Sequence, residues 1–421
     1  MVAHPVDTSG YPICLGRQPI LDREQRIVAY ELLFRSSCNH NAAVVTDDFA
    51  ATAEVVVRAF ADFGLSTVLG DCLGYINVDE RFLSSNLVEL LPRERVVLEV
   101  LETVEMTPAV LTRLHELKAM GFRLALDDFT HLEAQYIPAL ALADIVKLDL
   151  SLLASDELVA AVQQLRCWTL NLLAEKIDDN TQFQQCARLG FDLFQGYFFA
   201  KPTILSGRRV DPARAGVLRL MNLALGEVEI NALELEFKHY PNLTYKLLRL
   251  VNSVALGIPV KIHSLRHALV VLGRRQLQRW LQLLLFTQRP DGVAGQPLLT
   301  LAAVRGKLME LMMDDLAPHQ REQADQAFMV GVLSLLDALF GTPLPELLAE
   351  LNLADPVRMA LLSHQGTLGR LLQIILLSEQ NQFDELIAEL AELPSLSLLQ
   401  FNQAQLQALG WANELAISNG R

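Results

Sequence analysis

Cysteine, tryptophan and long apolar runs are scarce in this chain of 421 residues. Its five cysteines are an odd number without the spacing of metal ligands, so we expect reduced, buried thiols rather than a disulfide scaffold. No stretch has the unbroken apolar length of a membrane span, and residues 1–12 lack the pattern of a signal peptide. We therefore expect a cytoplasmic protein without a membrane partner.

Basic residues are also few: the chain has 35 Lys and Arg against 49 Asp and Glu, which gives a net charge of −14. This balance argues against general binding to nucleic acid or to an anionic membrane surface, although a local basic groove for a small anion stays open. Hydrophobic residues make up 51 % of the chain, which is enough for well-buried cores. The length exceeds that of one ordinary core, so we expect two domains.

The two halves of the chain have different patterns. In the first half, short apolar stretches alternate with amphipathic segments of helical length, which predicts parallel βα units and a TIM-like (β/α) barrel. After about residue 210, leucine and alanine recur at helical spacing, which predicts an all-α domain. Proline, glycine and two arginines follow the last apolar stretch of the first half, so we predict domains at 1–203 and 204–421. The predicted strands lie in residues 26–34, 72–77, 95–100, 122–128, 144–149, 169–175 and 192–197.

Polar residues stand near the carboxyl ends of these seven predicted strands. A single one is more often a helix N-cap or a solvated charge than a ligand. Seven successive strand ends of this kind favour a site instead, because the carboxyl ends of parallel strands meet at one mouth of a barrel. Carboxylates, an amide and a lysine at such a mouth are typical of hard divalent metals acting on a phosphate. The residues are Glu31, Asn77, Glu99, Asp127, Asp128, Lys147, Glu175 and Gln195.

The same stretches resemble, in order, the motifs of the EAL domain, the cyclic di-GMP phosphodiesterase fold. The resemblance covers about residues 15–203, with Glu31-Leu32-Leu33 in the position of the Glu-Ala-Leu signature. Each motif alone is weak, but the full ordered set is specific. The matching segments are RQPILDREQRIVAYELLFR, INVD, EVLE, LALDDF, VKLD, LLAEKID and QGYFFAKP.

The resemblance implies a metal-dependent enzyme that opens cyclic di-GMP to the linear dinucleotide, with two Mg²⁺ or Mn²⁺ ions about 3.5–4 Å apart. Glu175 is expected to act as the catalytic base and Lys147 to orient the attacking water or offset developing charge. One ion is expected on Glu31, Asn77, Glu99 and Asp127, and the second on Asp127 and Asp128. Nucleotide contacts are expected from Gln18, Leu33, Arg35 and Gln195, and loop support from Glu102 and Asp178.

This chain departs from the family pattern at four supporting positions. Leu101 replaces a threonine, and Thr130 replaces a glycine and is followed by a rewritten loop. Lys176 replaces another glycine, and Asp178 replaces a glutamate. Loss of such support typically costs ~10–100-fold in metal affinity or activity, so we expect a weak phosphodiesterase. The alternative hypothesis is a catalytically inactive cyclic di-GMP receptor or scaffold.

The second half resembles HDOD domains, the catalytically empty relatives of HD-type metal phosphohydrolases. Residues 239–281 carry the resemblance, marked by Asn252, Ser253, Ala268 and Gly273. Ser334-Leu335 stands where an active HD site needs a His-Asp pair. The resemblance therefore implies a non-enzymatic domain that binds an unknown protein partner, and it leaves homodimerisation of the barrels open.

Overall fold

The computed structural model describes residues 13–36, 65–129, 134–199, 212–226, 228–251, 264–287, 296–349 and 351–419. The chain forms two compact units, of which the first combines residues 1–198 with 374–421 and the second is 199–373. The first unit therefore holds both the predicted strands and the last helices of the chain. Within the described residues, every helix is too short or too polar to cross a membrane.

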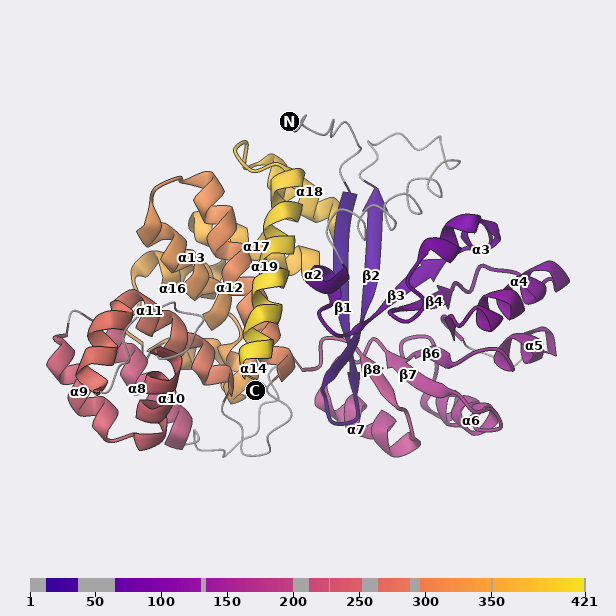
Figure 1. Ribbon diagram of the computed structural model, residues 1–421, viewed down its shortest axis with the longest axis horizontal. Coiled ribbons are helices and arrows are strands. Elements are labelled where there is room, and N and C mark those ends of the chain that lie inside the picture. Colours follow the sequence, from indigo (N-terminus) through magenta and orange to yellow (C-terminus); the bar gives the residue numbers. More distant parts are fainter. Residues whose placement is uncertain are drawn as a thin grey trace. The chain divides into compact units, whose positions relative to one another are not determined.

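Eight strands close into a barrel in chain order, from β1 to β8 (Figure 1). Strands β2 to β8 are parallel neighbours and correspond to the seven predicted stretches. Strand β1 runs antiparallel to both β2 and β8 and was not predicted as a separate strand. The strands are β1 (Ile13–Asp22), β2 (Ile27–Ser36), β3 (Leu73–Val78), β4 (Val96–Val100), β5 (Arg123–Leu126), β6 (Ile145–Asp149), β7 (Asn171–Glu175) and β8 (Leu193–Gln195).

Short helices connect the parallel strands, and their ends follow ordinary capping rules. Thr107 accepts a hydrogen bond from the backbone of Val110 at the start of α4, and Asp179 caps α7 in the same way. The helices are α2 (Leu65–Leu69), α3 (Glu80–Ser84), η1 (Asn86–Leu90), α4 (Pro108–Ala119), η2 (Ala134–Tyr136), α5 (Ile137–Leu140), α6 (Ser155–Leu165) and α7 (Asn180–Leu189).

The barrel interior contains two stacked layers, because side chains two residues apart on a strand point to the same face. In β4, for example, Val97 belongs to an apolar layer and Glu99 to a polar layer nearer the carboxyl end. Seven strands contribute one residue each to the apolar layer. On every one of them this residue lies two positions from a predicted polar residue. Its buried residues are Ile20, Ala29, Tyr75, Val97, Ala125, Ile145 and Leu173.

The outer face of β2 is covered by helices that lie far apart in the sequence. Tyr30 and Leu32 alternate with the inward residues of β2 and pack against Val68 and Leu69 of α2. Leu406 of the last helix, α19 (Leu398–Asn419), completes this apolar cluster. The β1–β2 hairpin has no crossover helix of its own, so the end of the chain supplies cover that a crossover helix provides elsewhere.

Two hydrogen bonds attach the end of the chain to the barrel. Asn413 Nδ2 donates to the carbonyl of Thr67 over 3.0 Å, and the Tyr197 hydroxyl donates to the carbonyl of Glu379. Glu379 ends α17 (Gly366–Glu379), which is followed by α18 (Phe383–Ala391). The last 48 residues, 374–421, therefore belong to the barrel's own unit.

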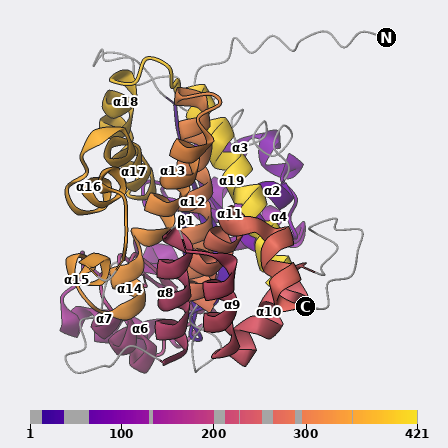
Figure 2. The same ribbon diagram turned by 90° about the vertical axis from the view of Figure 1, so that its left-hand side faces the viewer.

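The second unit is helical throughout its described elements (Figure 2). Helix α11 contains a break at Gly273, whose φ of 73° is left-handed and suits glycine. The helices are α8 (Pro212–Leu225), α9 (Ile230–Lys238), α10 (Pro241–Val251), α11 (Leu265–Thr287), α12 (Gln296–Leu316), α13 (Arg321–Leu333), α14 (Leu336–Phe340), α15 (Leu344–Ala349) and α16 (Asp355–Ser363).

Candidate functional site

One buried ammonium group lies at the centre of the polar layer. Lys147 is 1 % exposed, and its Nζ pairs with the carboxyl groups of four residues from four other strands or strand ends. It is 2.6 Å from Glu175 Oε1 and 3.1 Å from Asp127 Oδ1, and it also pairs with Glu99. Glu31 Oε2 lies 3.7 Å away. One positive charge thus faces four carboxyl groups, which leaves the cluster with an excess of acid.

The charge imbalance shifts the pKa values of the cluster. Burial raises the pKa of Glu175 to about 7, and neighbouring carboxylates add to this effect although Lys147 opposes it. Burial and then the nearby Glu31 carboxylate hold the pKa of Glu99 well above its usual range. Burial alone would lower the pKa of Lys147, but the surrounding carboxylates outweigh it and hold that pKa well above its usual value. A further cation would relieve this carboxylate excess.

Three buried oxygen atoms of this layer have no hydrogen-bond donor among the described residues. They are Asn77 Oδ1, Glu99 Oε2 and Gln195 Oε1. Unpaired buried acceptors are costly, and all three are oxygens, the ligand type that Mg²⁺ and Mn²⁺ prefer. The donor set therefore fits a hard divalent cation.

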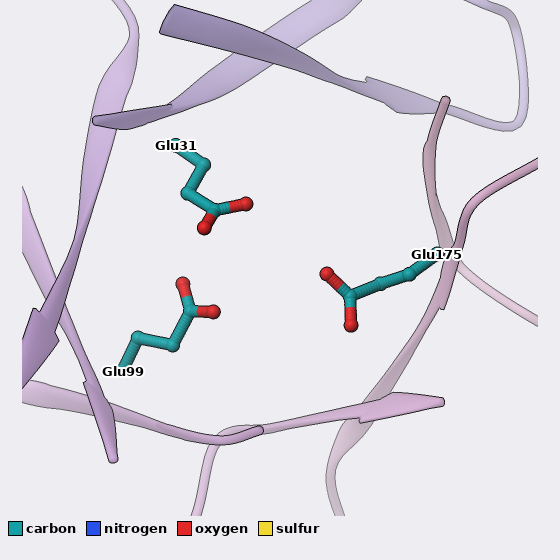
Figure 3. Close-up of side chains that lie close together, drawn as sticks. All are labelled: Glu31, Glu99 and Glu175. Atoms are coloured by element: carbon teal, nitrogen blue, oxygen red, sulfur yellow. The ribbon is translucent and has the colours of Figure 1, made fainter. Parts of the chain in front are cut away.

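The carboxyl groups fall into two sets that are each close enough to share an ion. In the first set, Glu31, Glu99 and Glu175 offer oxygens within 4.8 Å of one another, and their side chains converge inside the ring of strands (Figure 3). The second set lies toward the rim and consists of Glu102, Asp127 and Asp128. Asp127 also contacts Lys147, the residue whose ammonium group pairs with all three carboxyl groups of the first set. Two adjacent sets are compatible with a two-ion arrangement.

Amide side chains connect the first set to strands β1, β3 and β8. Gln195 Nε2 donates to Glu31 and, over 2.8 Å, to Gln18 Oε1, while Asn77 Nδ2 is 3.5 Å from Glu31 Oε1. The residue after Gln195 must be glycine, because a Cβ on Gly196 would lie 2.2 Å from a backbone oxygen. The predicted residues Gln18, Glu31, Asn77 and Gln195 are thus brought together.

Lys176, which stands where the family pattern has a glycine, is accommodated by its backbone and by an ion pair. Its φ of 54° is left-handed, a conformation that glycine adopts without strain. Its ammonium group pairs with Asp149, which is 1 % exposed and also accepts a 2.7 Å hydrogen bond from Ser151 N. Asp149 was not among the predicted site residues. Its spacing of two from Lys147, which directs both side chains inward, was the signal available in the sequence.

The remaining predicted residues are less closely tied to the cluster. Leu33 is half-buried, whereas Glu102 and Asp178 are exposed in the turns after β4 and β7. The side chain of Arg35 and residue Thr130 lie outside the described part of the structure, as do Asn252 and Ser253. The roles assigned to the individual site residues stay predictions.

The position expected for an HD metal pair has a different environment. Ser334 Oγ accepts a 2.6 Å hydrogen bond from Arg305 and donates to the Gly331 carbonyl, and Leu335 is 2 % exposed. Among the described residues, both sets of acidic groups that are close enough to share an ion lie in the barrel. An arginine and an apolar side chain at this position do not suit a cation.

The helical unit has one buried carboxylate with several cationic partners. Glu310 pairs with Arg279, with Lys307 over 3.0 Å, and more distantly with Arg275. Burial raises the pKa of Glu310, but Arg279 and then Lys307 outweigh it and hold the pKa below its usual value. This cluster is paired without any added ion, unlike the one in the barrel.

Comparison with known proteins agrees with the two-part organisation. The model of the EAL domain matches residues 13–202, and that of the HDOD domain matches residues 217–346. The chain is 31 % identical over 410 residues to the uncharacterized protein YuxH of Bacillus subtilis, covering 96 % of this chain and 98 % of that protein. It is also 31 % identical over 420 residues to the cyclic di-GMP phosphodiesterase CdgJ of Vibrio cholerae, covering 98 % and 95 % respectively.

Solved structures of EAL proteins also resemble this chain. One is BlrP1 of Klebsiella pneumoniae in a manganese and cyclic di-GMP complex at pH 9.0, with 24 % identity and a TM-score of 0.37. The match covers 46 % of this chain and 57 % of that one. The whole-length matches to YuxH and CdgJ, together with the two domain matches, show that the chain belongs to the cyclic di-GMP phosphodiesterase family of EAL-domain proteins in which an HDOD domain follows.

Proposed function

We propose that the barrel is a metal-dependent phosphodiesterase that hydrolyses cyclic di-GMP to the linear dinucleotide, with weak activity. The observation that carries the proposal is the excess of buried acid around Lys147, including acceptor oxygens that no described donor satisfies. A phosphate substrate is anionic, so this acidic site suits it only after divalent cations have reversed the local charge. The similarity to CdgJ supports cyclic di-GMP as the substrate.

Each residue of the cluster has a role in this proposal. The first ion would be held by Glu31, Asn77, Glu99 and Asp127, and the second by Asp127 and Asp128. When bound, Mg²⁺ or Mn²⁺ supplies charge stabilisation at the phosphoryl oxygens and lowers the pKa of water. Gln18, Leu33, Arg35 and Gln195 bind and orient the dinucleotide, and Glu102 and Asp178 support the loops that flank the site.

Proton transfer is assigned to Glu175. Burial raises the pKa of Glu175 to about 7 without metal, which suits a group that accepts a proton from water near neutral pH. Lys147 keeps its positive charge and offsets the negative charge that develops on the substrate oxygens. Weak activity is expected because Leu101 and Thr130 replace supporting groups of the family pattern and the loop after Thr130 is rewritten.

The test is turnover of cyclic di-GMP by the full-length protein with Mg²⁺ or Mn²⁺, compared with a chelator. Glu175→Gln is expected to abolish turnover and to leave nucleotide binding within about threefold, because it removes the base and keeps the shape. Glu80→Gln, an exposed carboxyl on α3, is the matched control. Turnover of cyclic di-GMP by Glu175→Gln at the wild-type rate would contradict the role of Glu175 as the catalytic base.

The second candidate function is a cyclic di-GMP receptor without hydrolysis. It is favoured by the engagement of the Lys147 ammonium with four carboxyl groups, which opposes the release of Lys147 for catalysis. Calorimetry would distinguish the two functions. Binding of cyclic di-GMP without any turnover under Mg²⁺ or Mn²⁺ would establish the receptor, and turnover would exclude it.

We further assign a role in protein interaction to the HDOD domain. The support is the arginine-paired Ser334 and the buried Leu335 at the expected metal position, which leave that position without ligands. Phosphatase activity measured on full-length Glu175→Gln with Mn²⁺ and a generic phosphoester is expected to be absent. Metal-dependent activity that survives in this variant would contradict a non-enzymatic domain.

A further inference from the structure

A cavity of about 530 Å³ opens at the amino-terminal end of the barrel strands, opposite the candidate metal site. Its wall includes Ala29, Tyr75, Val97 and Ile145 of the apolar interior layer, and each of these is 4 % exposed or less. The cavity therefore extends into the barrel core. Its volume falls within the range of about 300–1,000 Å³ that is typical of small-molecule sites.

The wall chemistry favours an apolar occupant. Each of these four residues lies two positions before a residue of the polar layer, so the cavity ends one layer below the carboxyl cluster. Ala29 contributes only a methyl group to this layer. Unfilled apolar space loses contacts that a bound apolar group would restore.

The rim chemistry favours a negative charge on that occupant. Arg123, the first residue of β5, is exposed and forms no ion pair with any described residue. The neighbouring Asp144 is already engaged, because it pairs with Lys118 over 2.5 Å and accepts a 2.9 Å hydrogen bond from Leu124 N. Half-buried Trp168, which also lines the cavity, adds a flat aromatic surface to its wall.

We propose that this cavity is a second ligand site, which takes a small molecule with an apolar, ring-sized body and one acidic group. The body occupies the space against Ala29 and Tyr75, and the acidic group pairs with Arg123 at the rim. The site is separate from the metal cluster and uses none of its side chains, so it stands independently of the proposed phosphodiesterase activity.

The test compares two dyes of similar ring structure on the full-length protein. The probe 8-anilinonaphthalene-1-sulfonate carries an acidic group, and N-phenyl-1-naphthylamine lacks it. Fluorescence titration is expected to show one saturable site for each, with energy transfer from Trp168. Arg123→Gln is expected to weaken sulfonate binding about tenfold and to change binding of the neutral dye by less than about twofold.

Control variants distinguish this site from dye adsorption elsewhere. Arg81→Gln, an exposed arginine on α3, is expected to leave both affinities unchanged. Ala29→Leu fills the cavity and is expected to abolish both, provided that circular dichroism shows an intact fold. Equal sulfonate affinity in the wild type, Arg123→Gln and Arg81→Gln would overturn the proposal, and so would binding that survives in folded Ala29→Leu.

Discussion

The buried charges of the barrel and those of the helical unit follow opposite arrangements. In the barrel, Lys147 is a single cation among four carboxyl groups, and several oxygens lack a donor. In the helical unit, Glu310 is a carboxylate among cationic partners. In the helical cluster the protein's own cations balance the carboxylate, whereas in the barrel cluster the carboxyl groups outnumber the single ammonium group. The difference suggests that unpaired buried charge, rather than buried charge as such, indicates a ligand site.

The largest effect should come from removing the only cation in the barrel cluster. Lys147→Met leaves the carboxyl groups facing one another, and we expect a loss of about 3–5 kcal/mol in the free energy of unfolding without metal. Mn²⁺ should restore part of this loss by supplying positive charge at the same place. Urea unfolding with a chelator and with Mn²⁺ measures both. The matched control is Lys176→Met, whose exposed ammonium pairs with a single carboxylate. An equal loss with and without Mn²⁺ would contradict the charge argument.

Metal binding alone should stabilise the wild-type barrel. At a Mn²⁺ concentration about 100 times the dissociation constant, the expected gain in unfolding free energy is about 2.7 kcal/mol. Glu99→Gln should reduce the gain, since Glu99 is 0 % exposed and has an unpaired oxygen in the cluster. Thermal melts over a Mn²⁺ titration provide the measurement. A gain of equal size in Glu99→Gln would mean that the ion binds elsewhere.

The helical cluster should respond to mutation but not to metal. Glu310→Gln removes the carboxylate that Arg279 and Lys307 share. Both cations stay partly exposed, so we expect a loss of about 2 kcal/mol, with no rescue by Mn²⁺. Trp280 of α11 reports unfolding of this unit when the other two tryptophans are replaced by phenylalanine. Glu346→Gln, an exposed carboxyl on α15, is the matched control. If Mn²⁺ restored the free energy of unfolding of Glu310→Gln, the proposed difference between the two clusters would be wrong.

A smaller effect is expected from pH on the same helical cluster. The pKa of Glu310 lies below its ordinary value of 4.5 in the folded protein. Its ion pairs therefore contribute stability fully above about pH 4.5, and this contribution is lost as the pH falls through the lower, folded-state pKa. Melts followed at Trp280 should show a steeper loss of stability below pH 4.5 in the wild type than in Glu310→Gln. Parallel curves for the two proteins would contradict this.

The sequence was sufficient for the barrel strands and for the polar layer because both depend on local patterns. Alternation along a strand and the carboxyl-end rule placed Glu31, Glu99 and Glu175 at one mouth without any knowledge of long-range contacts. Strand β1 was missed because its antiparallel pairing has no crossover helix to separate it from β2 in the sequence pattern. Asp149 lies in the matched segment VKLD but was given no role, because its pairing with Lys176 depends on the fold.

Contacts between distant segments could not be predicted in the same way. Nothing local in Leu406 shows that it packs against Tyr30 and Leu32, because any apolar helix face could cover that sheet. The cavity at the amino-terminal ends of the strands was equally hidden, since it depends on which side chains surround it. Lys176 is intermediate, because its match to a glycine position signalled its left-handed backbone, but its pairing with Asp149 required the fold.

The attachment of the last helix to the barrel has a consequence for synthesis on the ribosome. Asn413 and Thr67, which share a hydrogen bond, are separated by 346 positions in the sequence. Tyr30 and Leu32 emerge early from the ribosome. Their outer apolar face lacks its contact with Leu406 until nearly the whole chain has been translated. During that interval the nascent barrel exposes an apolar surface, which chaperones can bind and through which the chain can aggregate. A ribosome that stalls within the helical unit would therefore release a barrel that is incomplete, although every strand of it has been made.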